Sequence, residues 1–242
     1  MLNHRLHIMT VPLLVSLMFI SCKENSTEPM NHQFFLGTIQ NWTGDGTEIL
    51  YVVAYTVGYS IVLDSTVIGR DGIFTLSSPL PSIPDSMLWN FLGTGVSDKW
   101  RQFTDYIERS KGFKYSCPTF EIYSHGQLMG VIRNENKIVA THSDLAIGDY
   151  VSHLSFVSTT TIVSGYYTMT LLDPTLINQY GQSQFRSEYN LNLKPGWNYI
   201  TMRVKSLSDS LRVYEVITES PPENKYFVEW TDPLNFSEWM VP

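Results

Sequence analysis

Apolar and polar residues alternate along much of the chain after residue 34. Residues 189–193 alternate Tyr, Leu and Leu with two asparagines, and residues 200–205 alternate Ile, Met and Val with polar side chains. A period of two is typical of β-strands in sheets that have one buried face and one wet face. These two stretches therefore predict antiparallel strands whose apolar side chains share one face.

Further strands are predicted wherever β-branched and aromatic runs end at Gly, Pro, Asn or Asp. Before residue 97 they span Phe35–Gln40, Ile49–Thr56, Ser60–Ile68, Ile73–Leu76 and Ser86–Phe91. After residue 112 they span Thr119–Tyr123, Gln127–Arg133, Asn136–Thr141, Tyr150–Val157, Thr161–Met169, Glu188–Leu193, Asn198–Lys205, Leu211–Thr218 and Tyr226–Trp230. The Asp-Gly pairs at 45–46 and 71–72 predict hairpin turns, because type I′ turns need positive φ.

Residues 97–112 are predicted to form a short helical connection between two domains. Trp100, Phe103 and Ile107 recur at helical spacing within this stretch. An alternating strand through Trp100–Tyr106 is the other interpretation.

Composition favours the same fold class. Charged residues make up 16% of the chain, below the usual ~25%, and alanine occurs only three times. Helices favour Ala, Glu and Lys, whereas β-branched and aromatic residues suit pleated surfaces. The chain is therefore predicted to be all-β, with two antiparallel β-sandwich-like domains at residues 34–96 and 113–242.

The N-terminal segment has the pattern of an export signal. An apolar run, Val11–Ile20, follows the basic residue Arg5, and at ten residues it is too short to span a bilayer, which takes roughly 20. The sequence Phe19-Ile20-Ser21-Cys22 resembles a bacterial lipoprotein signal. That resemblance implies removal of residues 1–21, acylation of Cys22 and attachment to a membrane through the lipid. An ordinary cleaved signal with an incidental Cys is the alternative.

Residues 22–33 are polar after the cysteine and predict a flexible tether. Since Lys23, and not Asp, follows Cys22, the lipoprotein resemblance implies the outer membrane of a Gram-negative bacterium. If Cys22 is acylated, Cys117 has no partner within the chain, so no internal disulfide is expected.

Two further resemblances concern the folded part. The strand–turn–strand sequence within 61–76, with Asp64-Ser65 followed by Asp71-Gly72-Ile73-Phe74, resembles transthyretin-like and carboxypeptidase-regulatory-like domains. The segments 161–165 and 189–200, the second ending in a Gly-Trp-Asn turn, are similar to uncharacterised bacterial lipoproteins. Both resemblances imply β-sandwich folds, and neither implies an activity.

The sequence contains no motif for nucleophilic, metalloprotease, nucleotide-binding or dithiol chemistry. His142, Asp144, Asp149 and His153 lie close in sequence and could hold zinc, but they flank a turn, and no metal or cofactor is predicted. Ser124 and His125 are adjacent, and on a strand their side chains would point to opposite faces. We therefore predict no catalytic residue and no enzyme, although a hydrolase with paired carboxylates from distant positions is an alternative.

The net charge of −7 argues against nucleic-acid partners. We expect a lipid-anchored protein with a structural or binding role at the cell envelope: adhesion, assembly or an accessory subunit. Its partner would be an envelope protein, and a surface glycan-binding module is the alternative, because six tryptophans could stack on sugar rings. Trp197 is expected in the core. The candidate binding loop is the polar segment Asp173–Ser187, in which Tyr180 and Arg186 would be the recognition residues.

Overall fold

The computed structural model describes residues 36–56, 58–76, 80–90, 99, 101–110, 114–136 and 145–230. The predicted signal, Cys22 and the tether lie outside these residues and stay predictions. Strands dominate the described residues, so the all-β prediction is confirmed.

The strands before residue 97 are β1 (Leu36–Ile39), β2 (Ile49–Thr56), β3 (Tyr59–Val67), β4 (Ile73–Thr75) and β5 (Trp89–Asn90), with a 3-10 turn, η2, at Asp85–Met87. Those from 97 to 157 are β6 (Arg101–Arg109), β7 (Lys114–Ser116), β8 (Thr119–Ser124), β9 (Gln127–Glu135) and β10 (Tyr150–Val157). The remainder are β11 (Thr161–Leu171), helix α1 (Pro174–Tyr180), β12 (Gln184–Leu193), β13 (Gly196–Leu207), β14 (Leu211–Ile217) and β15 (Lys225–Trp230).

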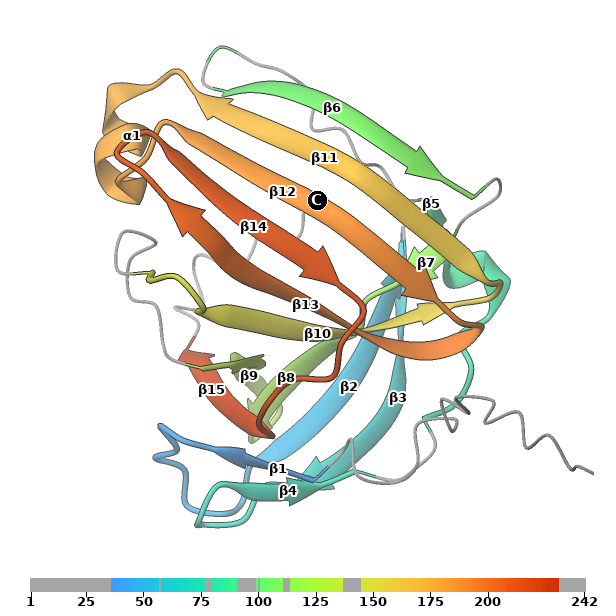
Figure 1. Cartoon of the computed structure of the whole chain (residues 1–242). Coiled ribbons are helices and arrows are strands. Elements are labelled where there is room, and N and C mark those ends of the chain that lie inside the picture. The colour runs from blue at the N-terminus through green and yellow to red at the C-terminus, as the bar shows by residue number, and fades with distance from the viewer. Residues whose placement is uncertain are drawn as a thin grey trace, which may run out of the picture.

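The described strands form one continuous sheet. Its main path runs β3-β2-β8-β9-β10-β13-β14-β12-β11-β6, and β9 also pairs with β15, which leads through β1 to β4. Most pairs are antiparallel, but β12–β14 and β1–β15 are parallel. We call β1–β4, β8, β9 and β15 the lower half and β6, β10–β14 the upper half, as they lie in Figure 1.

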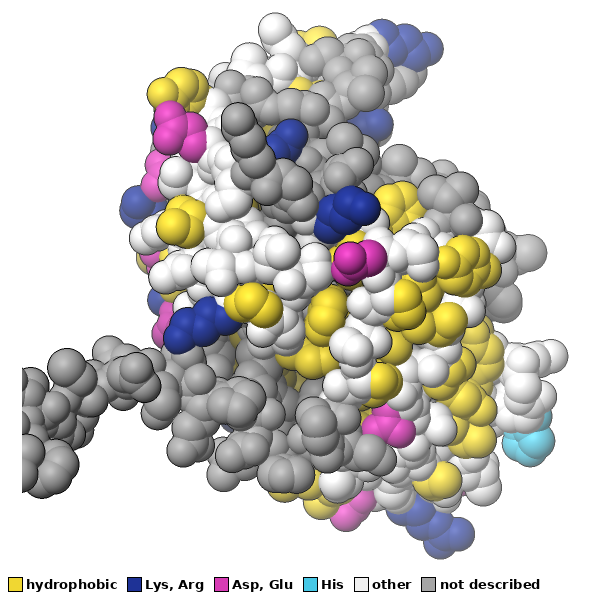
Figure 2. Space-filling view, turned by 90° about the vertical axis from the view of Figure 1, so that its right-hand side faces the viewer, with side chains coloured by type: hydrophobic (Ala, Val, Ile, Leu, Met, Phe, Trp, Pro, Cys, Tyr) yellow, Lys and Arg dark blue, Asp and Glu magenta, His cyan; other side chains and the backbone are white. Residues whose placement is uncertain are grey.

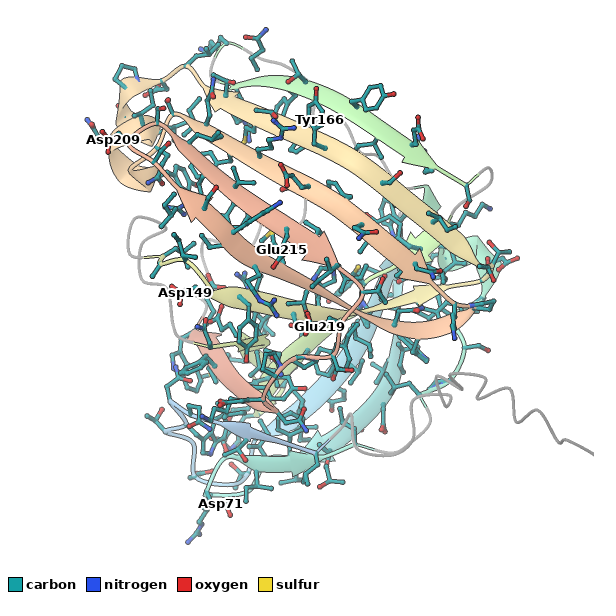
Figure 3. The ribbon with its side chains drawn as sticks, viewed as in Figure 1. Asp71, Asp149, Tyr166, Asp209, Glu215 and Glu219 are labelled. Carbon is teal, nitrogen blue, oxygen red and sulfur yellow. The ribbon has the colours of Figure 1, made fainter. Side chains whose placement is uncertain are left out.

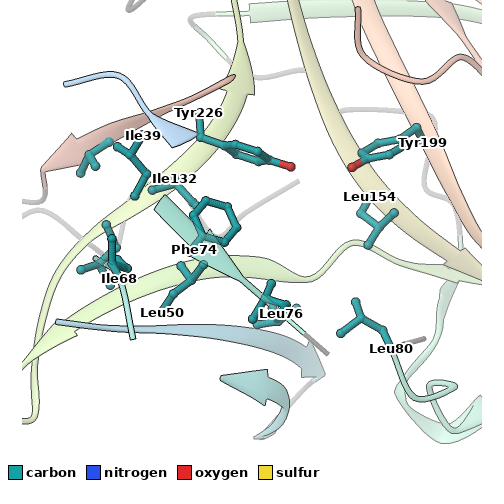
Figure 4. Close-up of a cluster of buried hydrophobic side chains, with 13 residues drawn as sticks. Ile39, Leu50, Ile68, Phe74, Leu76, Leu80, Ile132, Leu154, Tyr199 and Tyr226 are labelled. Carbon is teal, nitrogen blue, oxygen red and sulfur yellow. The ribbon is translucent and has the colours of Figure 1, made fainter. Parts of the chain in front are cut away.

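The lower half curls around the largest hydrophobic cluster. Leu50 and Val52 from β2, Ile122 from β8 and Phe74 from β4 meet there. Figure 4 shows Leu50 and Phe74 in this cluster together with Tyr226 of β15 and Tyr199 of β13. Residues from before and after position 97 therefore share one core.

Strands β10 and β13 separate this core from a second one. Tyr199 packs into the lower cluster, while its neighbour Ile200 packs into an upper cluster with Val163, Leu191 and Val216. Both faces of β13 are buried at this point, which explains why four successive residues, 198–201, have little exposed surface.

Trp197 lies at the junction of the two halves. Its half-buried ring packs against the lower cluster and a third cluster around Met87 and Phe156, and its indole Nε1 donates to the Leu80 carbonyl at 3.2 Å. The prediction that Trp197 belongs to the core is confirmed in this sense.

The helix predicted at 97–112 is wrong for its described residues. Residues 101–109 form β6, which pairs with β11 along its whole length. Phe103 and Ile107 are four residues apart, and that spacing places two side chains on one face of a strand as well as of a helix. Phe103 stacks on Tyr167 with ring centroids 5.5 Å apart, and Ile107 packs against the upper cluster.

The Asp-Gly turns do not close hairpins. The turn at 71–72 connects β3 to β4, but β4 pairs with β1 and β3 pairs with β2. The turn at 45–46 likewise joins β1 and β2, which do not pair with each other. Each turn instead connects two strands that are not neighbours in the sheet.

The structure does not divide at the predicted connection between domains. Strand β2 pairs with β8, and β1 pairs with β15, so the segments 34–96 and 113–242 share hydrogen bonds as well as a core. A domain normally has a core of its own, so the described residues do not confirm the two separate domains predicted from the sequence.

Candidate functional site

The predicted binding loop is shorter and more ordered than the sequence suggested. Strand β12 begins at Gln184, and α1 occupies most of the connection. Asp173 caps the helix by accepting from the amide of Thr175 at 2.6 Å, and Gly181 ends it at φ 75°. The interpretation of Asp173–Ser187 as one long loop is therefore wrong.

The structure does not bring Tyr180 and Arg186 together. The Tyr180 ring packs edge-on against Phe185, with centroids 5.8 Å apart, on the inner side of β12. Arg186 is on the opposite face, where its guanidinium carbon lies 3.9 Å from the centroid of the Tyr166 ring. The two residues cannot form one recognition surface, and a binding role for each stays a prediction.

Arg212 of β14 holds this connection in place. Its side chain is fully buried, and Nη2 donates to the Tyr180 carbonyl at 3.3 Å and to Gln182 Oε1 at 2.5 Å. Nη1 donates to the Tyr214 hydroxyl at 3.3 Å, while Nε has no hydrogen-bond partner among the described residues. Arg212 makes no ion pair with any residue that the structure describes, so neutral groups stabilise its charge, including the Phe185 ring, whose centroid lies 5.5 Å from the guanidinium carbon.

The exposed face of the upper half is a cross-strand row of polar and aromatic residues. The pairing registers place Tyr106, Tyr166, Glu188, Glu215 and Arg203 side by side on β6, β11, β12, β14 and β13. Figure 3 shows Tyr166 and Glu215 on this face. Arg203 pairs with Glu215 at 3.3 Å. Exposed pairs of this kind contribute little to stability.

A hollow lies on the outer face of the lower half. It encloses about 270 Å³ on strands β2, β3 and β8 and at the turn after β8. Its lining residues are Thr47, Ile49, Tyr51, Val53, Tyr55, Ser60, Val62, Glu121, Tyr123, His125 and Gly126. Figure 2 shows a band of hydrophobic side chains on the side of the molecule that carries β3.

Glu121 lies at the base of this hollow and is only 1% exposed. Its Oε1 accepts from the Tyr55 hydroxyl at 2.5 Å and from the Thr119 hydroxyl at 2.7 Å, and its Oε2 accepts from the Tyr123 hydroxyl at 3.1 Å. No described residue forms an ion pair with Glu121. A buried carboxylate without a counter-ion is costly unless hydrogen bonds stabilise it, and here three hydroxyls do so.

The tyrosines remain protonated at this site. Burial, followed by the bond to and the charge of Glu121, raises the pKa of Tyr55 far above its usual value. Burial and the Glu121 charge raise the pKa of Tyr123 to about 12. The Tyr51 ring meets the Tyr123 ring edge-on at 5.3 Å, which fixes the wall of the hollow.

His125 lines the hollow and Ser124 precedes it, and the expectation that their side chains point apart is wrong. Ser124 Oγ is 3.0 Å from His125 Nδ1, because His125 is in the turn after β8 with φ 51° and not on the strand. A Ser–His nucleophile also needs a group that orients the imidazole. Within the described chain no residue bonds the other ring nitrogen.

The structure describes only some of the residues that could hold zinc. His142 and Asp144 lie outside the described residues. Asp149 accepts from the Asn136 amide at 2.9 Å and from the Ala146 backbone amide at 2.6 Å, so it stabilises a turn. The described residues hold no group of three or more His, Cys, Asp or Glu side chains placed to bind a metal. None of their helices has the length and apolar composition to cross a bilayer.

No protein-family model, curated protein or solved structure matches this chain.

Proposed function

We propose that this chain is a non-enzymatic binding protein of the bacterial envelope, anchored through a lipid on Cys22, and that the Glu121 hollow is its ligand site. The Phe19–Cys22 sequence supports the anchor. The lower and upper halves, which do not coincide with the two β-sandwich-like domains inferred at 34–96 and 113–242, would be its two parts, joined through β10 and β13. The lower half would present the ligand site, and the polar tether would hold it away from an outer membrane.

The observation that carries the binding role is the buried, unpaired carboxylate at the base of a tyrosine-lined hollow. A concave, mostly apolar surface with a few convergent polar groups is the usual form of a ligand site. A core built for stability alone would not favour a charge there, because burial of the carboxylate costs free energy that a neutral residue would avoid.

A pair of matched variants tests the site. Val62 and Val67 are both 57% exposed on β3, and only Val62 lines the hollow. Arrays of peptides, small molecules and glycans are probed with the full chain, Val62→Trp and Val67→Trp. Binding that Val62→Trp abolishes and Val67→Trp preserves supports the proposal. Binding that survives in both variants, or disappears in both, places the ligand site elsewhere.

The anchor has a separate test. Mass spectrometry of the mature protein should find lipid on Cys22, and Cys22→Ser should release the protein from membranes. An unmodified mature N-terminus at another residue would contradict the anchor without affecting the hollow.

One observation favours glycan binding as a second candidate function. Tyr106 is 62% exposed, and its ring centroid lies 6.2 Å from that of Tyr166 at an interplanar angle of 31°. Such rings could contact successive sugars through Tyr106 and through the face of Tyr166 that Arg186 does not cover. Retention on insoluble polysaccharide should then be lost in Tyr106→Ala and kept in Val62→Trp.

A further inference from the structure

Several hydroxyl groups of the hollow can only accept hydrogen bonds from a ligand, and this indicates the class of ligand. A hydroxyl carries one proton and two lone pairs, so a hydroxyl that donates to a carboxylate can only accept from anything else. Tyr55 and Tyr123 both donate to Glu121. Thr47, on the same lining, donates its proton to Asp45 Oδ1 at 2.6 Å. Three of the five hydroxyls that line the hollow therefore offer only acceptors to a ligand, while those of Tyr51 and Ser60 can donate or accept.

The charges of the hollow also favour a cationic ligand. Glu121 brings a negative charge to the base, and Asp45 brings another beyond Thr47. Hydrogen bonds from Thr47 lower the pKa of Asp45, which keeps it ionised. Arg70 is not part of the lining and donates its Nε–H to the Asp45 backbone carbonyl at 2.9 Å, and His125 is the one basic residue in the lining. A ligand with a positive charge would be attracted by Glu121 at the base and by Asp45 beyond Thr47.

The walls suit a cation on an alkyl stem. Ile49, Val53 and Val62 provide apolar surface, against which methylene groups can pack. Tyr51 and Tyr123 provide rings whose faces attract cations. The volume of about 270 Å³ is below the usual range of sites for whole drug-sized ligands, so it fits one side chain or one small molecule.

We infer that the hollow binds an alkylammonium or alkylguanidinium group, carried by a Lys or Arg side chain of a partner protein or by a free amine. This inference rests on the proposed function of the hollow and adds the chemical class of the ligand. Carboxylates and phosphates are disfavoured because they would face acceptors and like charge. Neutral hydroxyl compounds could donate to the same acceptors, but they would gain nothing from the buried charge.

The test uses four probes with the same alkyl chain: n-butylammonium, n-butylguanidinium, n-butanol and butyrate. Each is titrated into the full chain in detergent, and saturable shifts of the methyl resonances of Ile49, Val53 and Val62 are followed by NMR. We expect saturation by the two cations and none by the other two probes. Equal or tighter binding of butanol or butyrate would overturn the inference.

Two variants of equal net charge separate the specific carboxylate from general attraction. Glu121→Gln should weaken butylammonium binding at least tenfold, while Glu229→Gln, at an exposed carboxylate of β15 that pairs with Arg133, should leave it unchanged. Equal weakening by both variants would overturn the inference. If Glu121→Gln does not fold, Tyr123→Phe serves instead, because it removes one acceptor and keeps the charge. It should weaken binding severalfold, and unchanged binding would count against the site.

Further binding measurements identify whether the cation belongs to a protein or to a free amine. They also separate the cation inference from the proposed ligand site. Binding of Lys or Arg peptides, with loss on lysine acetylation, identifies a protein ligand, whereas binding of butylammonium alone identifies a free amine. If a neutral sugar binds, is blocked by Val62→Trp, and butylammonium does not bind, the cation inference fails and the ligand site stands. If nothing binds in a manner blocked by Val62→Trp, both fail.

Discussion

Glu121 in the lower half and Arg212 in the upper half are both buried charges without an ion pair among the described residues, yet their surroundings differ. Hydroxyl donors surround Glu121 beside an open hollow, whereas Arg212 meets a backbone carbonyl, an amide oxygen and a phenol at the end of α1. Burial alone therefore does not identify a functional group. The presence of an adjacent space, and the type of group that faces it, separates a ligand site from a structural anchor.

The largest expected effect comes from removing the acceptors of Arg212. Residues 173–182 are replaced by Asn-Gly, which deletes Tyr180 and Gln182 and leaves the guanidinium buried with one polar partner. We expect a loss of about 3–5 kcal/mol, as for other buried charges that lose their partners, measured by urea unfolding. Thr175→Ala, which keeps both acceptors, is the control and should cost less than about 1 kcal/mol.

Adding Arg212→Met to the shortened chain should restore part of the lost stability, because no uncompensated charge would remain. If the shortened chain is as stable as the native one, the connection at 173–182 does not stabilise Arg212. The contrast between the two buried charges would then be contradicted.

Arg212→Ala in the intact chain should have a somewhat smaller effect. Neutral acceptors without a donor cost about 1–3 kcal/mol each when buried, and some of them can turn toward water. We expect a loss of about 2–4 kcal/mol. Arg203→Ala provides the comparison, since Arg203 is partly exposed in pairs with Glu215 and Glu219 and should cost about 0–1 kcal/mol. Equal losses would show that Arg212 is an ordinary surface-type cation.

Glu135 extends the comparison to a second carboxylate, because it is half-buried and no described residue donates a hydrogen bond to it. Burial is the main cause that raises the pKa of Glu135 to about 7. A raised pKa for an acid means that its contribution to stability is full below about pH 4.5 and is lost as the pH rises to about 7.

Glu135→Gln should therefore stabilise the protein at pH 8 by about 1–2 kcal/mol and have no such effect at pH 4. Chemical unfolding of both proteins at the two pH values measures this difference. A variant that is less stable at pH 8 would show that the ionised carboxylate has a stabilising partner in solution.

The sequence predicted local structure well where the pattern depended on neighbouring residues. The predicted bounds of β2 and β10 agree with those observed, because alternation and flanking turns are local signals. The cap signals of α1 were also present, with Asp173 before Pro174 and Gly181 after the last turn, but a seven-residue helix has almost no periodicity to reveal it.

The candidate site could not be predicted in the same way. Tyr55 and Glu121 are 66 residues apart and meet only because β2 pairs with β8. The acceptors of Arg212 are 30 and 32 residues away from it and depend on the parallel pairing of β12 with β14. Parallel pairs have no hairpin turn that connects them, so the sequence predicted strands at 188–193 and 211–218 but not that they are neighbours.

The smallest expected effect is at Arg186, the residue that the sequence favoured as a recognition group. Its guanidinium lies over the Tyr166 ring and its Nε is 3.5 Å from Glu188, with more than a third of the side chain exposed. Exposed ion pairs and exposed cation–π contacts each contribute about 1 kcal/mol or less. Arg186→Ala should therefore cost less than about 1 kcal/mol in urea unfolding, and Lys205→Ala, at the neighbouring cation bound to Glu188, is the control. The same variant should bind butylammonium as tightly as the native chain, because Arg186 is not part of the lining of the hollow. A loss of butylammonium binding in Arg186→Ala, with Lys205→Ala unaffected, would move the recognition site to the upper half and leave Glu121 as a structural charge like Arg212.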